Sequence, residues 1–297
     1  MKDILQAIDK APSQFEASIP AVEKKIFREI SLILKELKTT SGGKIEPSID
    51  NLKLVSEIKG KLGKIVTGKE YKALVEKFVS NFPAITNYQT STEGLPAAGK
   101  KMLTAAAKMQ IDATLENLIG AGYKQTVTDA VAKMLVTSVT SGASYNDMLE
   151  TLQTTLQGTE EKPGILSNYA KTYVNDTLGQ FAGQGNKIVA TALKSEWFQY
   201  VGSNLTTTRE FCEHLTKKRY VHISEIPTIL KGEIDGHQCK INPATGLWLG
   251  AKDGTDENNF IENRGGWNCG HELIPVNEVS VPQSIRAKFE SNYFSKK

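Results

Sequence analysis

The chain carries, at residues 264–276, the stretch Arg264-Gly-Gly-Trp-Asn-Cys-Gly-His-Glu-Leu-Ile-Pro-Val276. This stretch contains Cys269 and His271. Cysteine, histidine and tryptophan are unevenly distributed along the 297 residues. All three cysteines, all four histidines and all three tryptophans follow residue 195, within or close to the segment from Trp197 to Pro275. Residues that merely fill a core would be scattered along the chain. The distribution therefore predicts a specialised C-terminal part.

The cysteines and histidines of this part are candidate metal ligands. Three pairs share the spacing of one intervening residue, Cys212-x-His214, His237-x-Cys239 and Cys269-x-His271, and His222 is the seventh candidate. Residues i and i+2 of a strand point to the same face, so each pair can present sulfur and imidazole to one centre. A closed set of four such ligands is typical of structural zinc, although the spacing of a standard zinc finger is absent.

Three other interpretations of these residues stay open. The cysteines can be small buried hydrophobes and the histidines can make ordinary hydrogen bonds. A catalytic Cys–His pair is a second interpretation, disfavoured because no motif for a nucleophile elbow or an oxyanion hole is nearby. A Cys212–Cys269 disulfide is a third. The odd number of cysteines argues against a disulfide framework and favours a reducing compartment.

The first 195 residues have the periodicity of helices. Apolar residues 22, 26, 30, 33 and 37 keep a spacing of three or four, with Pro20 as the expected start and Gly42-Gly43 as the stop. A further helix is expected to end at Pro83, and others are expected over 97–119, 125–139, 145–156 and 165–181. From Glu196 onward, aromatic and β-branched residues alternate with turn signals, which predicts short strands and tight loops.

The expected fold is therefore a mainly α N-terminal part followed by a small α+β, short-strand, loop-rich Cys/His module. The expected divisions are a helical N-terminal domain at 1–160, linking helices at 161–195, the module at 196–282 and a C-terminal tail at 283–297. The module has few aliphatic residues. A thin core of this kind commonly needs a metal or a disulfide to stay folded.

Composition excludes several classes of protein. The hydrophobic content of 39% and charged content of 23% fit a soluble globular protein. No apolar run is long enough to span a bilayer and the N-terminus does not resemble a signal peptide, so no membrane association is expected. The net charge of +3 tolerates contact with a polyanion but does not require one.

Several ordered segments of the C-terminal part resemble one family. They are Glu196-Trp-Phe-Gln-Tyr-Val-Gly202, Thr207-Thr-Arg-Glu-Phe-Cys212, Tyr220-Val-His222 and the stretch at 264–276. Together they resemble the C-terminal domain of phage head morphogenesis proteins, the minor head proteins similar to phage Mu protein F. The resemblance covers roughly residues 165–282, whereas residues 1–160 resemble no family that we can name.

The resemblance implies a site. By position, the family pattern points to Cys212, His222, Cys269 and His271 as ligands of a structural zinc ion. The alternates are His214, His237 and Cys239. Arg209 is expected to pair with an acidic group such as Glu225 or to brace the ligand loop. Trp197 and Trp267 are expected to pack against the site.

The resemblance also implies a function. Such proteins are minor, non-enzymatic components of the virion head, assembled in the bacterial host cytoplasm, and several copies per particle are expected. Their partners are the portal protein, the major capsid protein or both, with packaged DNA as a further partner and a role in DNA packaging or ejection. No catalytic residue is expected. The alternatives are a zinc-containing nucleic-acid-binding protein, for which Lys217-Lys-Arg-Tyr220 is the only basic–aromatic cluster, and a toxin or effector carrying this module.

Overall fold

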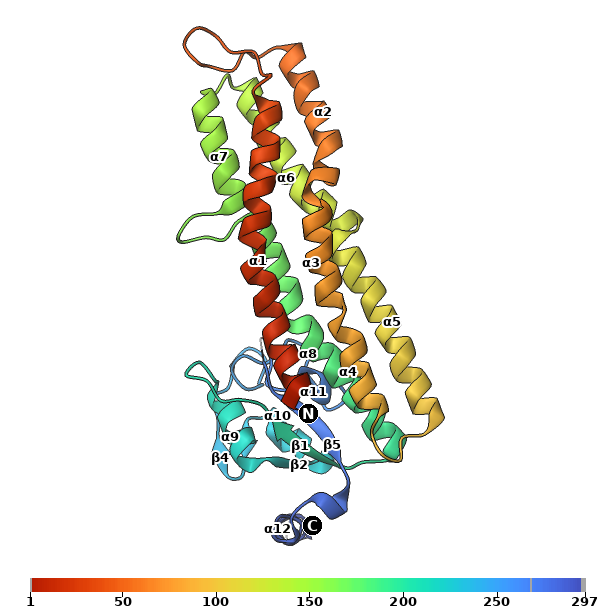
Figure 1. Cartoon of the computed structure of the whole chain (residues 1–297). Helices are drawn as coiled ribbons and strands as arrows, with labels where there is room; N and C mark the ends of the chain where they lie inside the picture. Colours follow the sequence, from red (N-terminus) through yellow and green to blue (C-terminus); the bar gives the residue numbers. More distant parts are fainter. Residues whose placement is uncertain (1, 268, 295–297) are drawn as a thin grey trace. The chain divides into compact units, whose positions relative to one another are not determined.

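A computed structural model describes residues 2–267 and 269–294 (Figure 1). The expected fold class is confirmed, because long helices are followed by a small region of helices and short antiparallel strands. The helices before residue 195 are α1 (Lys2–Leu34), α2 (Ile49–Val66), α3 (Lys69–Val79), α4 (Asn81–Thr90), α5 (Ala97–Ile119), α6 (Ala121–Thr140), α7 (Tyr145–Gln157) and α8 (Ile165–Leu193).

In the described part of the C-terminal region there are five strands and several short helices. The strands are β1 (Trp197–Val201), β2 (Tyr220–His222), β3 (Glu233–Ile234), β4 (His237–Gln238) and β5 (Glu272–Val276). The helices are α9 (Glu210–Lys218), η1 (Ile223–Glu225), α10 (Ile226–Leu230), α11 (Phe260–Asn263), η2 (Glu278–Ser280) and α12 (Gln283–Phe294). Among the described residues, no helix has both the length and the apolar character needed to cross a membrane.

The chain forms two compact units, each assembled from separate segments. We call Lys10–Ser80 with Ile111–Val174 the helical unit, and Met1–Asp9 with Asn81–Gln110 and Asn175–Lys297 the mixed unit. Helices α1, α5 and α8 contribute residues to both units. The boundaries expected at 160, 195 and 282 divide the chain into consecutive segments. Each compact unit instead combines segments that are distant in the sequence.

The helical unit is a bundle whose helices lie side by side (Figure 1). In α1, Phe15 packs against Tyr71 and Phe78 of α3, with ring centroids 6.2 and 5.5 Å apart. Glu23 is also buried, and its Oε1 accepts a hydrogen bond from the backbone N–H of Ser167 at 2.8 Å. This carboxylate thus caps the first turn of α8.

Four expected helix ends were wrong. The first helix ends at Leu34, well before Gly42-Gly43, and α8 continues to Leu193, beyond the expected end at 181. The other two involve proline. Pro20 lies inside α1, because buried Phe15 and Ile19 continue the apolar face upstream of the expected start. Pro83 lies in the first turn of α4 and does not end a helix. Proline is tolerated there because the first-turn N–H groups have no partner within the helix.

The mixed unit contains a three-stranded antiparallel sheet in the order β2-β1-β5, and a separate β3-β4 pair. The register fixes the two ends of β1. Trp197 lies opposite His222 and Val276, whereas Val201 lies opposite Glu272. Residues that immediately precede β5 therefore lie at the Val201 end of the sheet, and β2 ends at the Trp197 end.

The core of the mixed unit combines aliphatic and aromatic side chains. Phe211 of α9 stacks on Trp248, with centroids 4.2 Å apart and ring planes 7° apart, and Phe260 meets Trp248 edge to face. Buried Cys212, Cys239 and Cys269 belong to the same cluster. The cluster also contains leucine, isoleucine and valine side chains, such as Leu215, Ile226 and Leu273, so the expectation of few aliphatic core residues was wrong.

Candidate metal centre

Three of the predicted ligands come together in the mixed unit. Cys212 lies in α9, while Cys269 and His271 lie in the loop that leads into β5. The Sγ atoms of Cys212 and Cys269 are 3.9 Å apart, and the Sγ of Cys269 is 3.7 Å from Nδ1 of His271. All three side chains are buried, and their ligand atoms lie within 4.8 Å of one another. This cluster, which we call the Cys₂His centre, can hold a metal ion.

The histidine is oriented by a partner that the sequence analysis missed. Nε2 of His271 lies 3.2 Å from the amide oxygen Oδ1 of Asn204, so the ring donates its Nε2–H to that oxygen. The tautomer that carries this proton leaves a lone pair on Nδ1, which faces Cys269. An outer hydrogen bond of this kind is the usual way in which proteins orient a metal-ligating imidazole.

Tyr200 is a second partner that the sequence analysis missed. Its ring stacks on His271, with centroids 5.2 Å and planes 10° apart, and its hydroxyl lies 3.7 Å from the Sγ of Cys269. Burial and the two cysteines raise the pKa of Tyr200 well above its ordinary value. The phenol therefore stays protonated and can donate to a cysteine sulfur.

The two cysteines differ in acidity. A hydrogen bond from the thiol of Cys212, with further stabilisation from the charge of Arg264, holds the pKa of Cys269 well below its ordinary value. The same pairing, together with burial, raises the pKa of Cys212. Cys269 is therefore the thiolate of the pair and can supply a charged sulfur to a cation.

A glycine allows the two sulfurs to approach. A Cβ atom on Gly265 would contact the Sγ of Cys212, and would lie 2.6 Å from the Sγ of Cys269 and 3.0 Å from the hydroxyl of Tyr200. Any other residue at this position would displace a ligand. The Gly265-Gly266 pair was visible in the sequence as a turn signal, but its role beside the sulfurs was not.

The loop that carries Cys269 is held in place by an arginine. Nη1 of Arg209 donates to the carbonyl oxygen of Gly265 at 3.1 Å, and Nη2 donates to that of Trp267. Nε1 of Trp248 also donates to the Gly265 oxygen, at 3.3 Å. Of the two roles expected for Arg209, the structure shows bracing of the ligand loop. Glu225 pairs instead with Lys218, at 2.8 Å.

His222 does not join the Cys₂His centre, contrary to the implied ligand set. Its ring lies at the Trp197 end of the sheet, 5.0 Å from Trp197 and 4.3 Å from Phe289 between centroids, and its Nδ1 caps η1. The Cys269 loop lies at the opposite end of β1. Four residues of strand correspond to about 13 Å, which is too far for one ion to bridge.

The assumption that every Cys-x-His pair shares a face also fails for Cys212 and His214. Both lie in α9, where residues two apart point about 200° from each other. Cys212 faces the core, while His214 stacks on His237 with centroids 3.7 Å apart.

The alternate ligand Cys239 is a neutral thiol. Burial and the neighbouring Glu210 raise its pKa to about 11.

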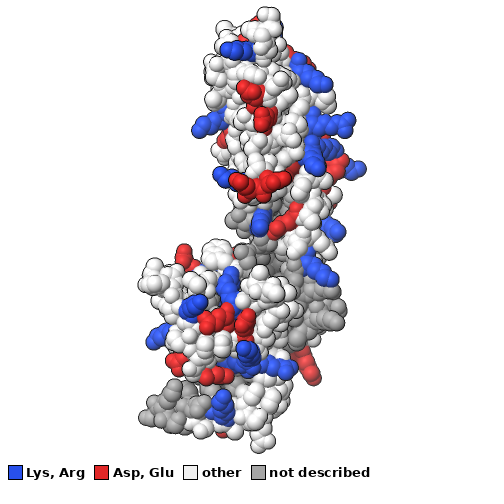
Figure 2. All heavy atoms as spheres, turned by 90° about the vertical axis from the view of Figure 1, so that its left-hand side faces the viewer, with Lys and Arg blue, Asp and Glu red and all other residues white. Residues whose placement is uncertain are grey.

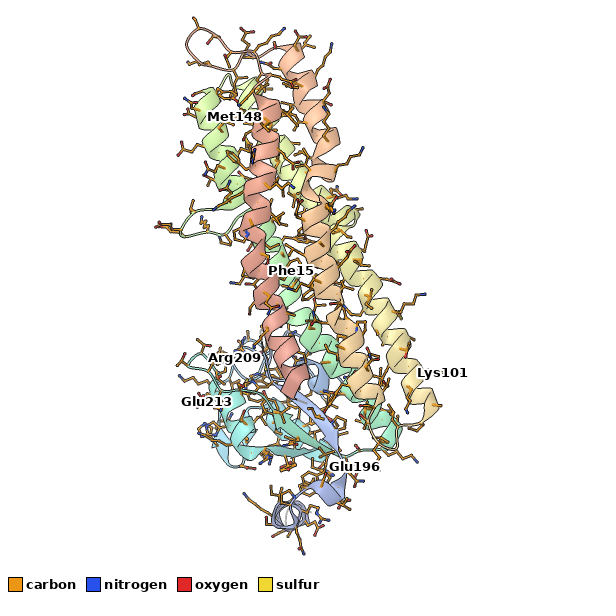
Figure 3. The ribbon with its side chains drawn as sticks, viewed as in Figure 1. Phe15, Lys101, Met148, Glu196, Arg209 and Glu213 are labelled. Atoms are coloured by element: carbon orange, nitrogen blue, oxygen red, sulfur yellow. The ribbon has the colours of Figure 1, made fainter. Side chains whose placement is uncertain are left out.

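The two tryptophans behave differently. Trp197 is buried and packs on His222 and Phe289, away from the cysteines. Trp267 lies in the ligand loop, is 49% exposed, and has Nζ of Lys252 5.0 Å from its ring centroid. Arg209, which is labelled in Figure 3 and lies just before α9, holds this loop by its hydrogen bond to the carbonyl oxygen of Trp267.

Within the described part of the chain, no fourth Cys, His, Asp or Glu joins Cys212, Cys269 and His271. The centre therefore offers three protein ligands, one of which is a stabilised thiolate. Comparison with known proteins finds no matching family model, curated protein or solved structure.

Proposed function

We propose that the Cys₂His centre binds one Zn²⁺ ion, which stabilises the fold of the mixed unit. The observation that carries this proposal is the spacing of the ligand atoms. Zn–S bonds of about 2.3 Å and Zn–N bonds of about 2.0–2.1 Å at tetrahedral angles place two sulfurs about 3.8 Å apart and sulfur about 3.6 Å from nitrogen. The corresponding distances in the chain are 3.9 and 3.7 Å.

The donor set favours zinc. Thiolate and imidazole suit Zn²⁺, whereas carboxylate and carbonyl oxygens suit magnesium and calcium. A water molecule is the fourth ligand in this proposal. The role is structural because Cys212, Cys269 and His271 expose only 2, 7 and 5% of their surface, so a substrate has no access to the ion.

When bound, the ion joins α9 to the loop before β5. Its two cysteine ligands, Cys212 and Cys269, are 57 positions apart in the sequence. Because these ligands are not arranged in the unfolded chain, the free energy of binding adds to the free energy of folding. The core of the mixed unit thereby gains a cross-link.

The proposal is tested by measuring zinc per chain after purification without chelators, together with the thermal unfolding of the same samples. We expect close to one zinc in the natural chain and none in Cys269→Ser or His271→Ala. Cys239→Ser is the matched control, because Cys239 is equally buried but lies outside the centre, and this variant should keep its zinc. A natural chain without zinc would refute the proposal.

For the chain as a whole, we propose the role of a minor head protein that acts in phage head or procapsid assembly at the portal or inner shell. The support is the ordered set of segments between Glu196 and Val276 that resembles such proteins, and a metal centre suited to a rigid, non-enzymatic module. Co-purification of the chain with portal or major capsid protein tests this role. Absence of the chain from both procapsids and virions would contradict it.

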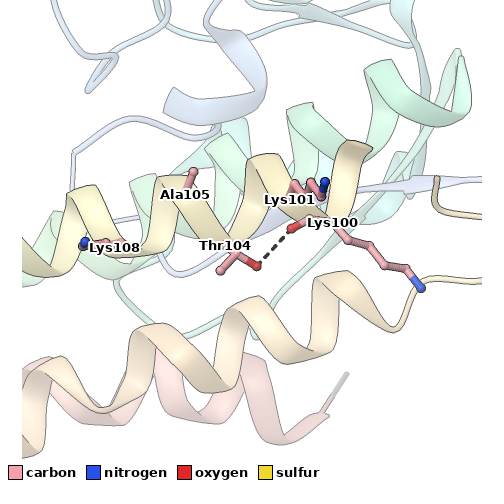
Figure 4. A pocket seen from close by; sticks show the side chains of 5 residues that line it. All are labelled: Lys100, Lys101, Thr104, Ala105 and Lys108. Carbon is pink, nitrogen blue, oxygen red and sulfur yellow. Dashed lines mark hydrogen bonds between the residues drawn. The ribbon is translucent and has the colours of Figure 1, made fainter. Parts of the chain in front are cut away.

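One surface feature favours contact with DNA as an additional role. A shallow, open depression of about 410 Å³ on the surface of α5, which we call the groove, is lined by Lys100, Lys101 and Lys108, together with Thr104 and Ala105 (Figure 4). On the face drawn in Figure 2, by contrast, acidic and basic side chains are interspersed, which gives a weak field for a polyanion.

Contact with DNA predicts binding that weakens steeply with salt concentration. Replacing Lys100, Lys101 and Lys108 with Ala should reduce this binding by more than replacing three exposed lysines of α2, Lys53, Lys61 and Lys64. An equal loss in the two triple variants would mean that only net charge matters, and would remove the groove as a DNA site.

A further inference from the structure

A second cluster of metal-ligand side chains lies outside the Cys₂His centre. Glu210 and His214 are four residues apart on α9, so their side chains share one face of the helix. His237, at the start of β4, meets them from the neighbouring hairpin. One ligand atom from each of these three side chains lies within 4.8 Å of the other two.

The cluster is held together by contacts on both sides of the carboxylate. Oε1 of Glu210 accepts a hydrogen bond from Nε2 of His237 at 3.0 Å, and Oε2 accepts one from the backbone N–H of Lys240 at 3.2 Å. The rings of His214 and His237 lie face to face, with planes 7° apart. Two imidazoles and a carboxylate are thus held together on two different elements.

An ion can reach this cluster from solvent. The side chains of His237 and Glu210 are each 41% exposed. Glu210 also lines a cleft of about 470 Å³, together with Lys240 and Leu249, whereas neither histidine lines it. The Cys₂His centre, by contrast, is buried, and its Cys212 is on the other side of α9 from His214.

We propose that Glu210, His214 and His237 bind a divalent transition-metal ion at a second, exchangeable site. Two imidazole nitrogens and one carboxylate oxygen form a donor set that suits Zn²⁺, Ni²⁺ or Cu²⁺, with water completing the coordination. Imidazole lone pairs lie in the ring plane, so one of the parallel rings rotates when the ion binds. Nε2 of His237 gives up its proton, which moves by way of solvent to Nδ1 of the same ring, and the hydrogen bond to Glu210 is replaced by one bond from each side chain to the metal.

The ion would fasten the β3–β4 hairpin to α9. Since α9 also supplies Cys212, the helix would carry one metal on each side. Binding is weaker than at the Cys₂His centre, because the donor set contains no thiolate and the site is open to water. The second ion is therefore the one that exchanges with metal in solution.

The test is a calorimetric titration of Zn²⁺ into the full chain already loaded with one equivalent of zinc. We expect one further binding event, weakened at least tenfold in His214→Asn, His237→Asn and Glu210→Gln. Glu213→Gln is the matched control on the same helix (labelled in Figure 3), and His222→Asn controls for histidine content; both should bind as the natural chain does.

Thermal unfolding of each variant without added metal shows whether it is folded. Absence of a second event in the natural chain, or unchanged affinity in folded His237→Asn, would overturn the proposal. The result is independent of the Cys₂His centre. Cys269→Ser should lose the tight zinc and keep the weaker event, so failure of one site is distinguishable from failure of the other.

Discussion

Arg264 donates a hydrogen bond from Nη2 to the carbonyl oxygen of Cys269, at 2.9 Å. The guanidinium is buried, with 1% of its surface exposed, and it also donates to the carbonyl of Gly179 in α8. Its Nε lies 3.4 Å from Oε1 of buried Glu272 in β5. One arginine thus connects the metal-ligand loop to a helix and to the sheet, and its charge helps to keep Cys269 ionised.

Replacing Arg264 with Ala should be among the most destabilising single changes in the mixed unit. The change removes an ion pair from buried Glu272 and a donor from the carbonyl of Cys269, for a cost of about 3–5 kcal/mol. Denaturant unfolding measures it. Arg286→Ala, which removes a partly exposed arginine 3.9 Å from Glu278, should cost less than about 1 kcal/mol. Similar losses in the two variants would contradict the anchoring role of Arg264.

Gly265→Ala should displace the cysteine sulfurs and lower the zinc content, because its Cβ would overlap the space between Cys212 and Cys269. Gly60→Ala is the control. Gly60 lies within α2 with open space around its missing Cβ, so alanine should stabilise the chain there by about 0.5–1 kcal/mol. Zinc content and thermal unfolding of both variants are the measurements. Full zinc binding by Gly265→Ala would show that the Sγ atoms of Cys212 and Cys269 do not lie against Gly265.

The helical half of the fold could be predicted from sequence because apolar periodicity is a local signal. The helix expected at 97–119 has the bounds of α5, and the one expected at 145–156 differs from α7 by a single residue. The error at Pro20 arose from treating proline as a start signal although the apolar spacing continued upstream to Phe15.

The site was harder to predict, because it depends on the register of distant segments. Clustering of Cys and His marked the correct part of the chain, and Cys212, Cys269 and His271 do meet. His222 could be excluded only from the pairing of β2 with the Trp197 end of β1. The supporting roles of Asn204, Tyr200 and Arg264 arise from tertiary contacts, which spacing in the sequence cannot reveal.

Stability should depend on pH through Glu23. Burial raises the pKa of this carboxyl above its ordinary value. The folded state therefore favours the protonated form, and this contribution to stability is complete at low pH and is lost as pH rises through the folded pKa. Glu23→Gln removes the titration, so its stability relative to the natural chain should increase from pH 4 to pH 7, by about 1.4 kcal/mol per unit of pKa shift.

Thermal unfolding over that pH range tests the role of Glu23. Glu36→Gln, at an exposed position, is the matched control and should leave the pH profile as it is. A pH profile for Glu23→Gln that runs parallel to that of the natural chain would mean that Glu23 is not the group responsible.

His222→Ala should lower stability without releasing zinc. The change removes the Nδ1 cap on η1 and the ring contacts with Trp197 and Phe289, with a cap alone worth about 1 kcal/mol. Zinc per chain and the melting temperature are measured on the same sample. If the folded variant loses its zinc, His222 is a ligand after all, as the resemblance to head proteins implies.

X-ray absorption at the zinc edge, on the full chain carrying one equivalent of zinc, tests the Cys₂His centre most directly. The account predicts two sulfur neighbours at about 2.3 Å and one imidazole nitrogen at about 2.0–2.1 Å, with an oxygen completing the shell. The Cys269→Ser variant should not bind zinc at the Cys₂His centre. Zinc added to this variant should therefore show no sulfur neighbours. A shell of nitrogen and oxygen alone in the natural chain would place the ion elsewhere and contradict the assignment of Cys212, Cys269 and His271.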